Sequence, residues 1–340
     1  MEDAGQNVRV ETCGCSSELR RLCDQCDVAQ GTFAACSLVC LNKHLAAAHA
    51  LQEPFDSAAR FADYLKHVNR QRAGTWERYQ EHRERVMALV TTAGAGGGDI
   101  AIFGAGNGSD LDLEQLASVF REIHLVDMDG EALERARQAL PSSTRNKVVL
   151  HAPVDLSGFT SRLDEWGENF PDDATLGQAA VTAAWDIVGF VMQKRENAFD
   201  VVLSAGVLSQ LTIPFLRACL TTQANWGRLS GAATVLHLVT LSESLRSGGV
   251  GVLVVDVLST KTAPGLSALV GRGRDELAAY IAREAAAGAI ALQPDPGTLL
   301  KQMQSPGLAA LMQDPSLTAP WLWNLGDAIQ LVYGLQFLRP

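Results

Sequence analysis

An apolar run that leads straight into a cluster of glycines constrains this chain more than any other feature. The segment IAIFGAGNG occupies residues 100–108. Glycine has no Cβ, so such a cluster can turn tightly and approach a ligand closely. An apolar strand, a glycine turn and a following helix form the opening of a nucleotide-binding βαβ unit.

Short apolar runs alternate with longer helical stretches from Asp99 to the end of the chain. This alternation predicts an α/β fold with a mainly parallel sheet, and the nearly continuous apolar runs predict strands covered on both faces. The predicted strands are Ile100–Phe103, Glu122–Val126, Lys147–Leu150, Phe199–Leu203, Val250–Val255, Ala289–Leu292 and Ile329–Phe337. The predicted helical stretches are Leu111–Val119, Gly130–Leu140, Gly177–Lys194 and a broken Ile213–Leu245, with an irregular insertion at Ser157–Asp173.

Composition divides the chain into three parts. Residues 1–52 are rich in Cys and His, residues 53–98 combine charged helical sequence with a glycine-rich linker, and residues 99–340 form the α/β domain. The run Gly94–Gly98 is expected to act as a hinge or linker. Cys219 lies in an apolar run and is expected to be a buried core thiol.

The net charge of -10 disfavours nucleic acid and anionic membranes as partners. The sequence contains no run of about 18 apolar residues, so it predicts no membrane span. The N-terminus reads Met-Glu-Asp and lacks the basic and apolar regions of a signal peptide. These features predict a cytoplasmic protein.

Acidic residues follow the second and third predicted strands. Asp127 can accept hydrogen bonds from both hydroxyls of a ribose, while Asp129 is suited to cap the next helix. Asp155 can bind the amino group of an adenine whose ring Leu156 covers. These acids and the glycine cluster together favour an adenosine ligand. Ser109 stands where a dinucleotide site needs its third glycine, which favours S-adenosylmethionine over NAD.

At these motifs the chain resembles the class I S-adenosylmethionine-dependent methyltransferases, from about residue 99 to the C-terminus. IAIFGAGNGSD, HLVDMD, VDL, FDVVLSAGVLSQL and LRSGGVGVLVVDVLS are similar to five successive family motifs. The resemblance implies a Rossmann-like, mostly parallel sheet with an antiparallel edge strand at Ile329–Phe337. It implies that the donor is bound by Gly104, Ala105, Gly106, Asn107, Asp127, Met128, Asp155, Leu156 and Ser204.

One motif departs from the family pattern. Many members carry an acid two residues before the first glycine, where this chain has Ile102. Asp110 or Asp99 is the expected substitute for binding the donor's amino group.

The sulfonium donor is already reactive, so an enzyme of this kind mainly positions the acceptor. The weak catalytic candidates are Tyr79, His82, Ser204 and Gln210, with Ser209 beside them. The expected activity is methyl transfer to a small molecule or a protein side chain. Two alternatives stay open. One is transfer or cyclisation of the aminocarboxypropyl group, which releases methylthioadenosine. The other is a zinc-finger adaptor without catalysis.

The helical segment before the first core strand carries several aromatic residues. Trp76, Tyr79 and Arg83 are spaced to share one helix face. With Tyr64 and His82, they either form a lid over the donor or dock the helices on the core.

The N-terminal part contains four pairs of potential metal ligands. Eight ligands suffice for two tetrahedral zinc sites. A cross-braced arrangement would place Cys13, Cys15, Cys36 and Cys40 at one zinc and Cys23, Cys26, His44 and His49 at the other. The stretch CSLVCLNKHLAAAH resembles HIT, MYND and B-box zinc fingers, a resemblance that implies protein binding. Residues 1–50 hold four Lys/Arg and six Asp/Glu, which gives no electrostatic support for nucleic acid. A purely structural role is equally open.

We predict two zinc ions per chain, bound by these eight residues. So small a polar module has no core of its own, so metal binding should supply its folding free energy. Cys36→Ser should therefore unfold the first fifty residues and leave the α/β domain folded. Elemental analysis and circular dichroism of protein purified without chelator measure both effects. One zinc ion per chain, or none, would contradict the cross-braced arrangement.

Overall fold

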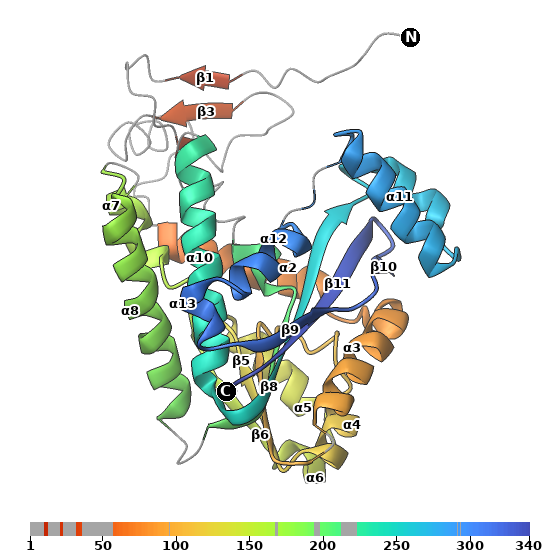
Figure 1. Cartoon of the computed structure of the whole chain (residues 1–340). Helices are drawn as coiled ribbons and strands as arrows, with labels where there is room; N and C mark the ends of the chain where they lie inside the picture. Colours follow the sequence, from red (N-terminus) through yellow and green to blue (C-terminus); the bar gives the residue numbers. More distant parts are fainter. Residues whose placement is uncertain are drawn as a thin grey trace.

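The computed structural model describes residues 10–12, 21–22, 32–35, 57–94, 96–166, 169–193, 198–211, 223–290, 292 and 294–340. Its centre is an eight-stranded mixed sheet with helices on both faces (Figure 1). Seven strands follow the order β10-β11-β8-β7-β4-β5-β6, and β9 pairs with β11. The strands are β4 (Asp99–Phe103), β5 (Glu122–Val126), β6 (Val148–His151), β7 (Phe199–Ala205), β8 (Leu245–Ser259), β9 (Gln313–Leu317), β10 (Trp321–Asn324) and β11 (Ile329–Leu338).

The strands β4 to β8 pair in parallel, whereas β11 runs antiparallel to β8. Helices or short helical turns precede and connect them. They are α2 (Ser57–Arg72), η1 (Trp76–Tyr79), α3 (Gln80–Ala93), α4 (Leu113–Val119), α5 (Gly130–Gln138), α6 (Ser142–Arg145), η2 (Thr160–Arg162), α7 (Leu163–Trp166), α8 (Asp173–Met192), α10 (Gln223–Ser244), η3 (Pro264–Leu269), α11 (Arg274–Ala286), α12 (Pro296–Met303) and α13 (Pro306–Ala309).

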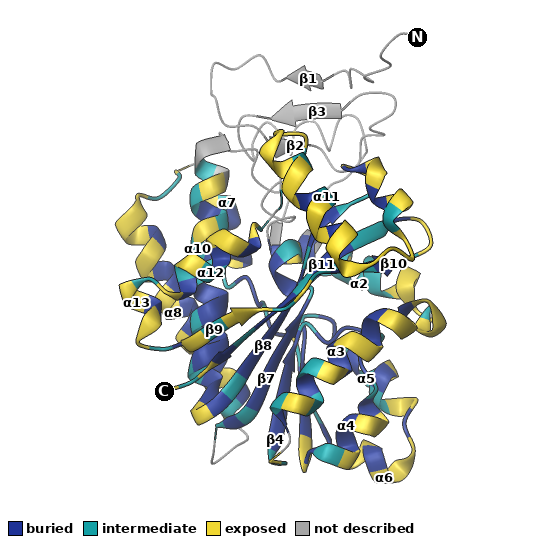
Figure 2. Cartoon of the chain, turned by 45° about the vertical axis from the view of Figure 1, so that its right-hand side comes forward, coloured by how far each residue is buried: buried dark blue, intermediate teal, exposed yellow. Residues whose placement is uncertain are grey.

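Each face of the sheet builds its own hydrophobic core, and β4 contributes to both. Ala101 and Phe103 pack in a cluster with α8 and α10, whereas Ile100 and Ile102 pack with α3, α4 and α5. Because successive side chains of a strand point to opposite faces, only an apolar strand can serve two cores. Figure 2 shows the buried strands between the two helical layers, whose outer surfaces are exposed.

The structure confirms the predicted α/β fold with a mostly parallel sheet. The five predicted core strands lie within one residue of their expected starts, except β8, which begins at Leu245. The late strand is antiparallel, as the resemblance implied. However, it is not an edge strand, because β9 and β10 flank it. The sequence reasoning missed both of these short strands.

The predicted strand Ala289–Leu292 is wrong, because its described residues belong to no strand. Gly288 has a φ of 67° and ends α11. Ile290 and Leu292 then pack their side chains on the core without β pairing. A short apolar run can belong to a loop that packs on the core as well as to a strand, and its pattern alone does not distinguish the two.

Gly94 and Gly98, at the two ends of the run predicted to be a hinge or linker, are closely packed. A Cβ on Gly94 would lie 2.2 Å from Cζ of Phe120, and one on Gly98 would lie 2.0 Å from Oδ2 of Asp200. The two ends of the run are therefore held by packing between α3 and β4. A Cβ on Gly96 would meet no atom within 4 Å, and hinge motion of the run stays a prediction.

Among the described residues, α8 is the one helix long and apolar enough by composition to cross a membrane. One side of it is buried against α10. A core helix shows this pattern, so α8 is assigned to the core.

In the N-terminal part, the described residues form three short strands, β1 (Val10–Thr12), β2 (Arg21–Leu22) and β3 (Thr32–Ala35), in the order β1-β3-β2. All eight predicted zinc ligands, and Cys219, lie outside the described residues.

We predict that Gly251→Ala destabilises the fold by about 1–3 kcal/mol, the usual effect of an added methyl in a packed core. Gly251 pairs with Phe337 across β8 and β11. An added Cβ would lie 2.1 Å from Cζ of that ring, which is itself buried. Urea unfolding followed by circular dichroism measures the change.

The matched control is Gly177→Ala on the exposed side of α8, where an added Cβ meets no atom within 4 Å. That substitution should stabilise the helix by up to about 1 kcal/mol. If Gly251→Ala were as stable as the wild type, the tight packing between β8 and β11 would be contradicted.

Candidate functional site

A pocket opens at the carboxyl ends of β4, β5, β7 and β8, beneath α2. From β4 the chain continues to β5 on one side and later to β7 on the other, so the strand order reverses between β4 and β7. In open α/β sheets, ligands bind at this switch point. The position of the pocket therefore marks it as the candidate site.

The predicted glycine cluster forms the turn that leaves β4 and lines the pocket. Gly104 and Gly106 have φ values of 76° and 48°, a region that other residues rarely adopt. A Cβ on Gly104 would lie 2.3 Å from Cγ2 of Val207. Glycine thus allows the turn to close against the segment that follows β7.

Asp127 lies at the end of β5 and binds this turn. Its Oδ2 accepts a hydrogen bond from the Gly106 N–H at 2.9 Å, and its Oδ1 accepts one from the Asp129 N–H at 2.8 Å. Burial raises the pKa of Asp127 to about 6, while these backbone donors oppose that rise. Asp129 caps α5 by accepting from the backbone N–H groups of Glu131 and Ala132.

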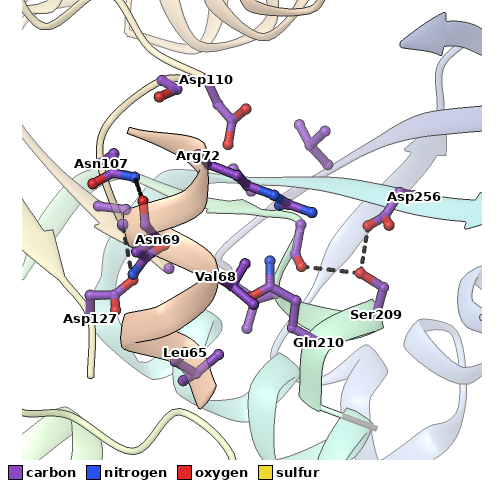
Figure 3. A pocket seen from close by; sticks show the side chains of 18 of the residues that line it. Leu65, Val68, Asn69, Arg72, Asn107, Asp110, Asp127, Ser209, Gln210 and Asp256 are labelled. Atoms are coloured by element: carbon purple, nitrogen blue, oxygen red, sulfur yellow. Dashed lines mark hydrogen bonds between the residues drawn. The ribbon is translucent and has the colours of Figure 1, made fainter. Parts of the chain in front are cut away.

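Helix α2 lies across the pocket, and Leu65 and Val68 are among its lining residues (Figure 3). Asn69 connects the helix to the loops below it. Its Nδ2 donates to Oδ2 of Asp129 at 3.0 Å, and its carbonyl accepts from Nδ2 of Asn107 at 2.6 Å. The helical segment thus covers the site, as a lid requires.

Two further carboxyl groups line the pocket. Burial raises the pKa of Asp110 to about 7 and also raises the pKa of Asp256. Oδ1 of Asp256 accepts a hydrogen bond from Oγ of Ser209 at 2.5 Å. Oδ1 of Asp110 is buried without a hydrogen-bond partner among the described residues, and Nε2 of His82 lies 3.5 Å away.

The side chain of Arg72 extends from α2 between Asp110 and Asp256 (Figure 3). Its charge lowers the pKa of each carboxyl, although burial is the larger effect. The sequence reasoning missed both Arg72 and Asp256. The signal for Asp256 was present, since it is the one ionisable residue within the apolar run VLVVDVL.

Tyr79 and His82 line the pocket beside the two tryptophans of β10. His82 stacks on Trp323 with ring centroids 4.0 Å apart, and its Nδ1 accepts from Nε1 of Trp321 at 3.2 Å. Burial lowers the pKa of His82 to about 3 and raises the pKa of Tyr79 to about 12. Both side chains are therefore neutral at physiological pH. An imidazole with so low a pKa is a weak base, and its Nδ1 already accepts from Trp321, so a role as pocket wall is favoured for His82.

Trp76 does not line the donor pocket with Tyr79, although it contacts Arg83 as the predicted common face requires. It is exposed, and the guanidinium of Arg83 lies 3.4 Å from the centroid of its ring. Tyr64, by contrast, does line the pocket.

Three other predicted residues lie away from the pocket lining. Ser204 is buried with its Oγ 2.7 Å from Nε2 of His237. The carboxylate of Asp155 accepts hydrogen bonds from the backbone and hydroxyl groups of Ser157 and Thr160, so it stabilises a turn. Asp99 is paired with Arg121.

The remaining predicted residues do line the pocket. Met128 follows Asp127, Leu156 comes from the loop after β6, and Gln210 lies one turn beyond the end of β7. The lining residues that match predictions are Gly104, Ala105, Gly106, Asn107, Asp127, Met128, Leu156, Tyr79, His82 and Gln210. Of the two expected substitutes for the missing acid, Asp110 lines the pocket and Asp99 does not.

Within the described residues, no group of three or more His, Cys, Asp or Glu side chains could hold a metal ion.

No protein-family model matches this chain, and no curated protein matches it. Among solved structures, it is similar to the N-methyltransferase NodS from Bradyrhizobium japonicum WM9 in complex with S-adenosyl-L-homocysteine. The identity is 14%, the match covers 84% of this chain and 100% of that one, and the TM-score is 0.38.

It is also similar to CalS10, an amino pentose methyltransferase from Micromonospora echinaspora. Here the identity is 19%, the coverage is 55% and 54%, and the TM-score is 0.26. A third similar structure is the glycopeptide N-methyltransferase MtfA, at 14% identity, 52% and 55% coverage and a TM-score of 0.31. Because these values are low, the fold assignment rests on the strand order of this chain.

We predict that Asp110→Asn stabilises the protein at pH 8 by at least about 1 kcal/mol and has little effect at pH 4. The folded protein keeps the Asp110 proton up to about pH 7, whereas the unfolded chain releases it near 3.8. The native state thus binds more protons between these pH values, so the wild type loses stability as pH rises through this window. Asparagine does not titrate and should remove that loss.

Urea unfolding at both pH values measures the effect, with Asp186→Asn on the exposed side of α8 as the control. If Asp110→Asn were less stable than the wild type at pH 8, Asp110 would be ionised in the folded wild type and stabilised by Arg72.

Proposed function

We propose that this chain is an S-adenosylmethionine-dependent methyltransferase acting on a small molecule or a protein side chain. One observation carries the proposal. The glycine turn at the switch point faces an acidic pocket with the carboxyl groups of Asp110, Asp127 and Asp256. S-adenosylmethionine carries a sulfonium and an ammonium group, so it is a ligand whose charge suits these acids.

The residues around the glycine turn fit an adenosine group. Asp127 uses one acceptor site of each oxygen for the backbone, and a carboxylate has further lone pairs that two ribose hydroxyls can use. Met128 and Leu156 offer apolar surface for the adenine ring. The amino group of the adenine has no assigned partner, because Asp155 is satisfied within its own turn.

The residues farther along the pocket fit the methionine end of the donor. Oδ1 of Asp110 has no hydrogen-bond partner among the described residues, so it is available to accept from the ammonium group. This supports Asp110 as the substitute for the acid missing at Ile102. Arg72 is suited to bind the carboxylate. An ammonium group next to Asp110 would favour its ionised form.

Asp127 also disfavours a dinucleotide. A pyrophosphate placed on the glycine turn would bring two negative charges close to the carboxylate of Asp127, and like charges in a partly buried site repel. Ser109 also replaces the third glycine of the dinucleotide pattern.

When bound, S-adenosylmethionine supplies an electrophilic methyl group. The chain contributes positioning, exclusion of water and proton acceptance. Leu65 and Val68 of α2 cover the site, and the neutral Tyr79 and His82 form part of its wall. Asp256, held by Ser209, is placed to accept a hydrogen bond from an acceptor amine or hydroxyl.

We further propose that the first 52 residues bind zinc. The ligand spacing supports this, and a protein partner for the module stays a prediction. The cytoplasmic location predicted from the sequence stays a prediction as well.

We predict that Asp127→Ala weakens S-adenosylmethionine binding by about 1.5–3 kcal/mol, the scale of hydrogen bonds to a charged group. Isothermal calorimetry of the full chain measures the affinity, with Asp186→Ala as the surface control. NAD should give no heat of binding.

Unchanged affinity in Asp127→Ala would remove this carboxylate from the ribose role. No binding of S-adenosylmethionine to the wild type would favour a non-catalytic adaptor. The product of turnover separates the two chemistries. S-adenosylhomocysteine identifies methyl transfer, whereas methylthioadenosine identifies aminocarboxypropyl transfer.

A further inference from the structure

A second cavity adjoins the donor pocket, beyond the end of α2. Both cavities share the side chains of Tyr64, Val68, Arg72, Tyr79, Leu325 and Gln330. The second cavity extends toward η1, the segment after β8 and the loop between β10 and β11. A ligand in it would therefore lie beside a donor bound at the glycine turn.

The two cavities differ in charge. Among the described residues, three carboxyl groups and one cation, Arg72, line the donor pocket. The described lining of the second cavity has three cations, Arg72, Arg78 and Lys261, a single carboxylate, Asp327, and also His67. The charge of the lining thus changes from acidic to basic across the residues that the cavities share.

The basic side chains are positioned by contacts that leave their charges available. The Arg78 side chain passes close to the loop at Gly326, where an added Cβ would lie 3.3 Å from Nη1. Nζ of Lys261 lies 3.5 Å from Oδ2 of Asp327, and both side chains are more than two-thirds exposed. Such an exposed pair is weak, so Lys261 can exchange this partner for a ligand anion.

We propose that the second cavity is the acceptor subsite and that it takes a small acceptor with an anionic group, a carboxylate or a phosphate. This inference rests on the proposed function. The anionic group would contact Arg78 and Lys261, and Arg72 would lie between acceptor and donor. The nucleophile of the acceptor would then point toward Asp256 and Ser209 in the donor pocket.

The proposed charge pattern also gives a basis for selectivity. A neutral analogue of the acceptor would leave the basic groups without a partner, and a cationic analogue would be repelled by them. In the transfer step, the acceptor nitrogen or oxygen forms a bond to the methyl carbon. The carbon–sulfur bond breaks with its electron pair passing to sulfur, and the acceptor proton passes to Asp256 or water.

The test uses the full chain saturated with S-adenosylhomocysteine and two probes of equal shape, benzoate and benzamide. Ligand-observed NMR titration gives their affinities. We expect benzoate to bind and benzamide to bind at least about fivefold more weakly. Arg78→Glu and Lys261→Glu should each weaken benzoate binding at least about fivefold. Arg85→Glu, an exposed charge reversal on α3 that lines neither cavity, should change it less than about twofold.

Equal binding of the two probes would overturn the inference. So would benzoate binding weaker than about 10 mM, or charge-reversal variants that bind benzoate like the wild type. Calorimetry of S-adenosylhomocysteine on the same samples reports separately on the proposed function, since Arg78 and Lys261 do not line the donor pocket. If the wild type does not bind S-adenosylhomocysteine, the donor assignment is contradicted, whatever the benzoate result.

Discussion

The hydrogen bond from the Gly106 N–H to the carboxylate of Asp127 is the interaction on which the site depends. It joins the turn after β4 to the end of β5, two strands that are neighbours in the sheet. The same carboxylate binds the N–H of Asp129, and Asp129 in turn caps α5 and accepts from Asn69 of α2. Two acids that stand two positions apart, Asp127 and Asp129, thus connect the glycine turn, the second strand, the next helix and the covering helix.

A buried carboxylate needs such donors, because desolvation disfavours its charge. The pocket contains three of these groups, and burial raises the pKa of each. Asp127 is satisfied by backbone N–H groups and Asp256 by Ser209, whereas Oδ1 of Asp110 lacks a partner among the described residues. A cationic ligand would supply the partner that Oδ1 of Asp110 lacks, so the electrostatics of the pocket favour the proposed donor.

Sequence reasoning was most successful where local pattern determines structure. The core strands are nearly continuous apolar runs, and the glycine turn with Asp127 follows from motif and order. It failed where tertiary context decides. It could not foresee that Ser157 and Thr160, only a few residues on, donate hydrogen bonds to both oxygens of Asp155, whose adenine role stays a prediction. Arg72 was missed because no local pattern shows that the end of α2 reaches the carboxyl edge of the sheet.

The central claim is that the glycine turn and α2 form one donor site. Hydrogen exchange with and without S-adenosylhomocysteine tests it most directly, because ligand contacts and helix closure both slow amide exchange. The account predicts slower exchange at Gly104–Gly108 and throughout residues 60–90, with α8 unchanged. Protection of the glycine turn alone would show that α2 only packs on the domain, and unchanged exchange in both segments would contradict the donor site itself.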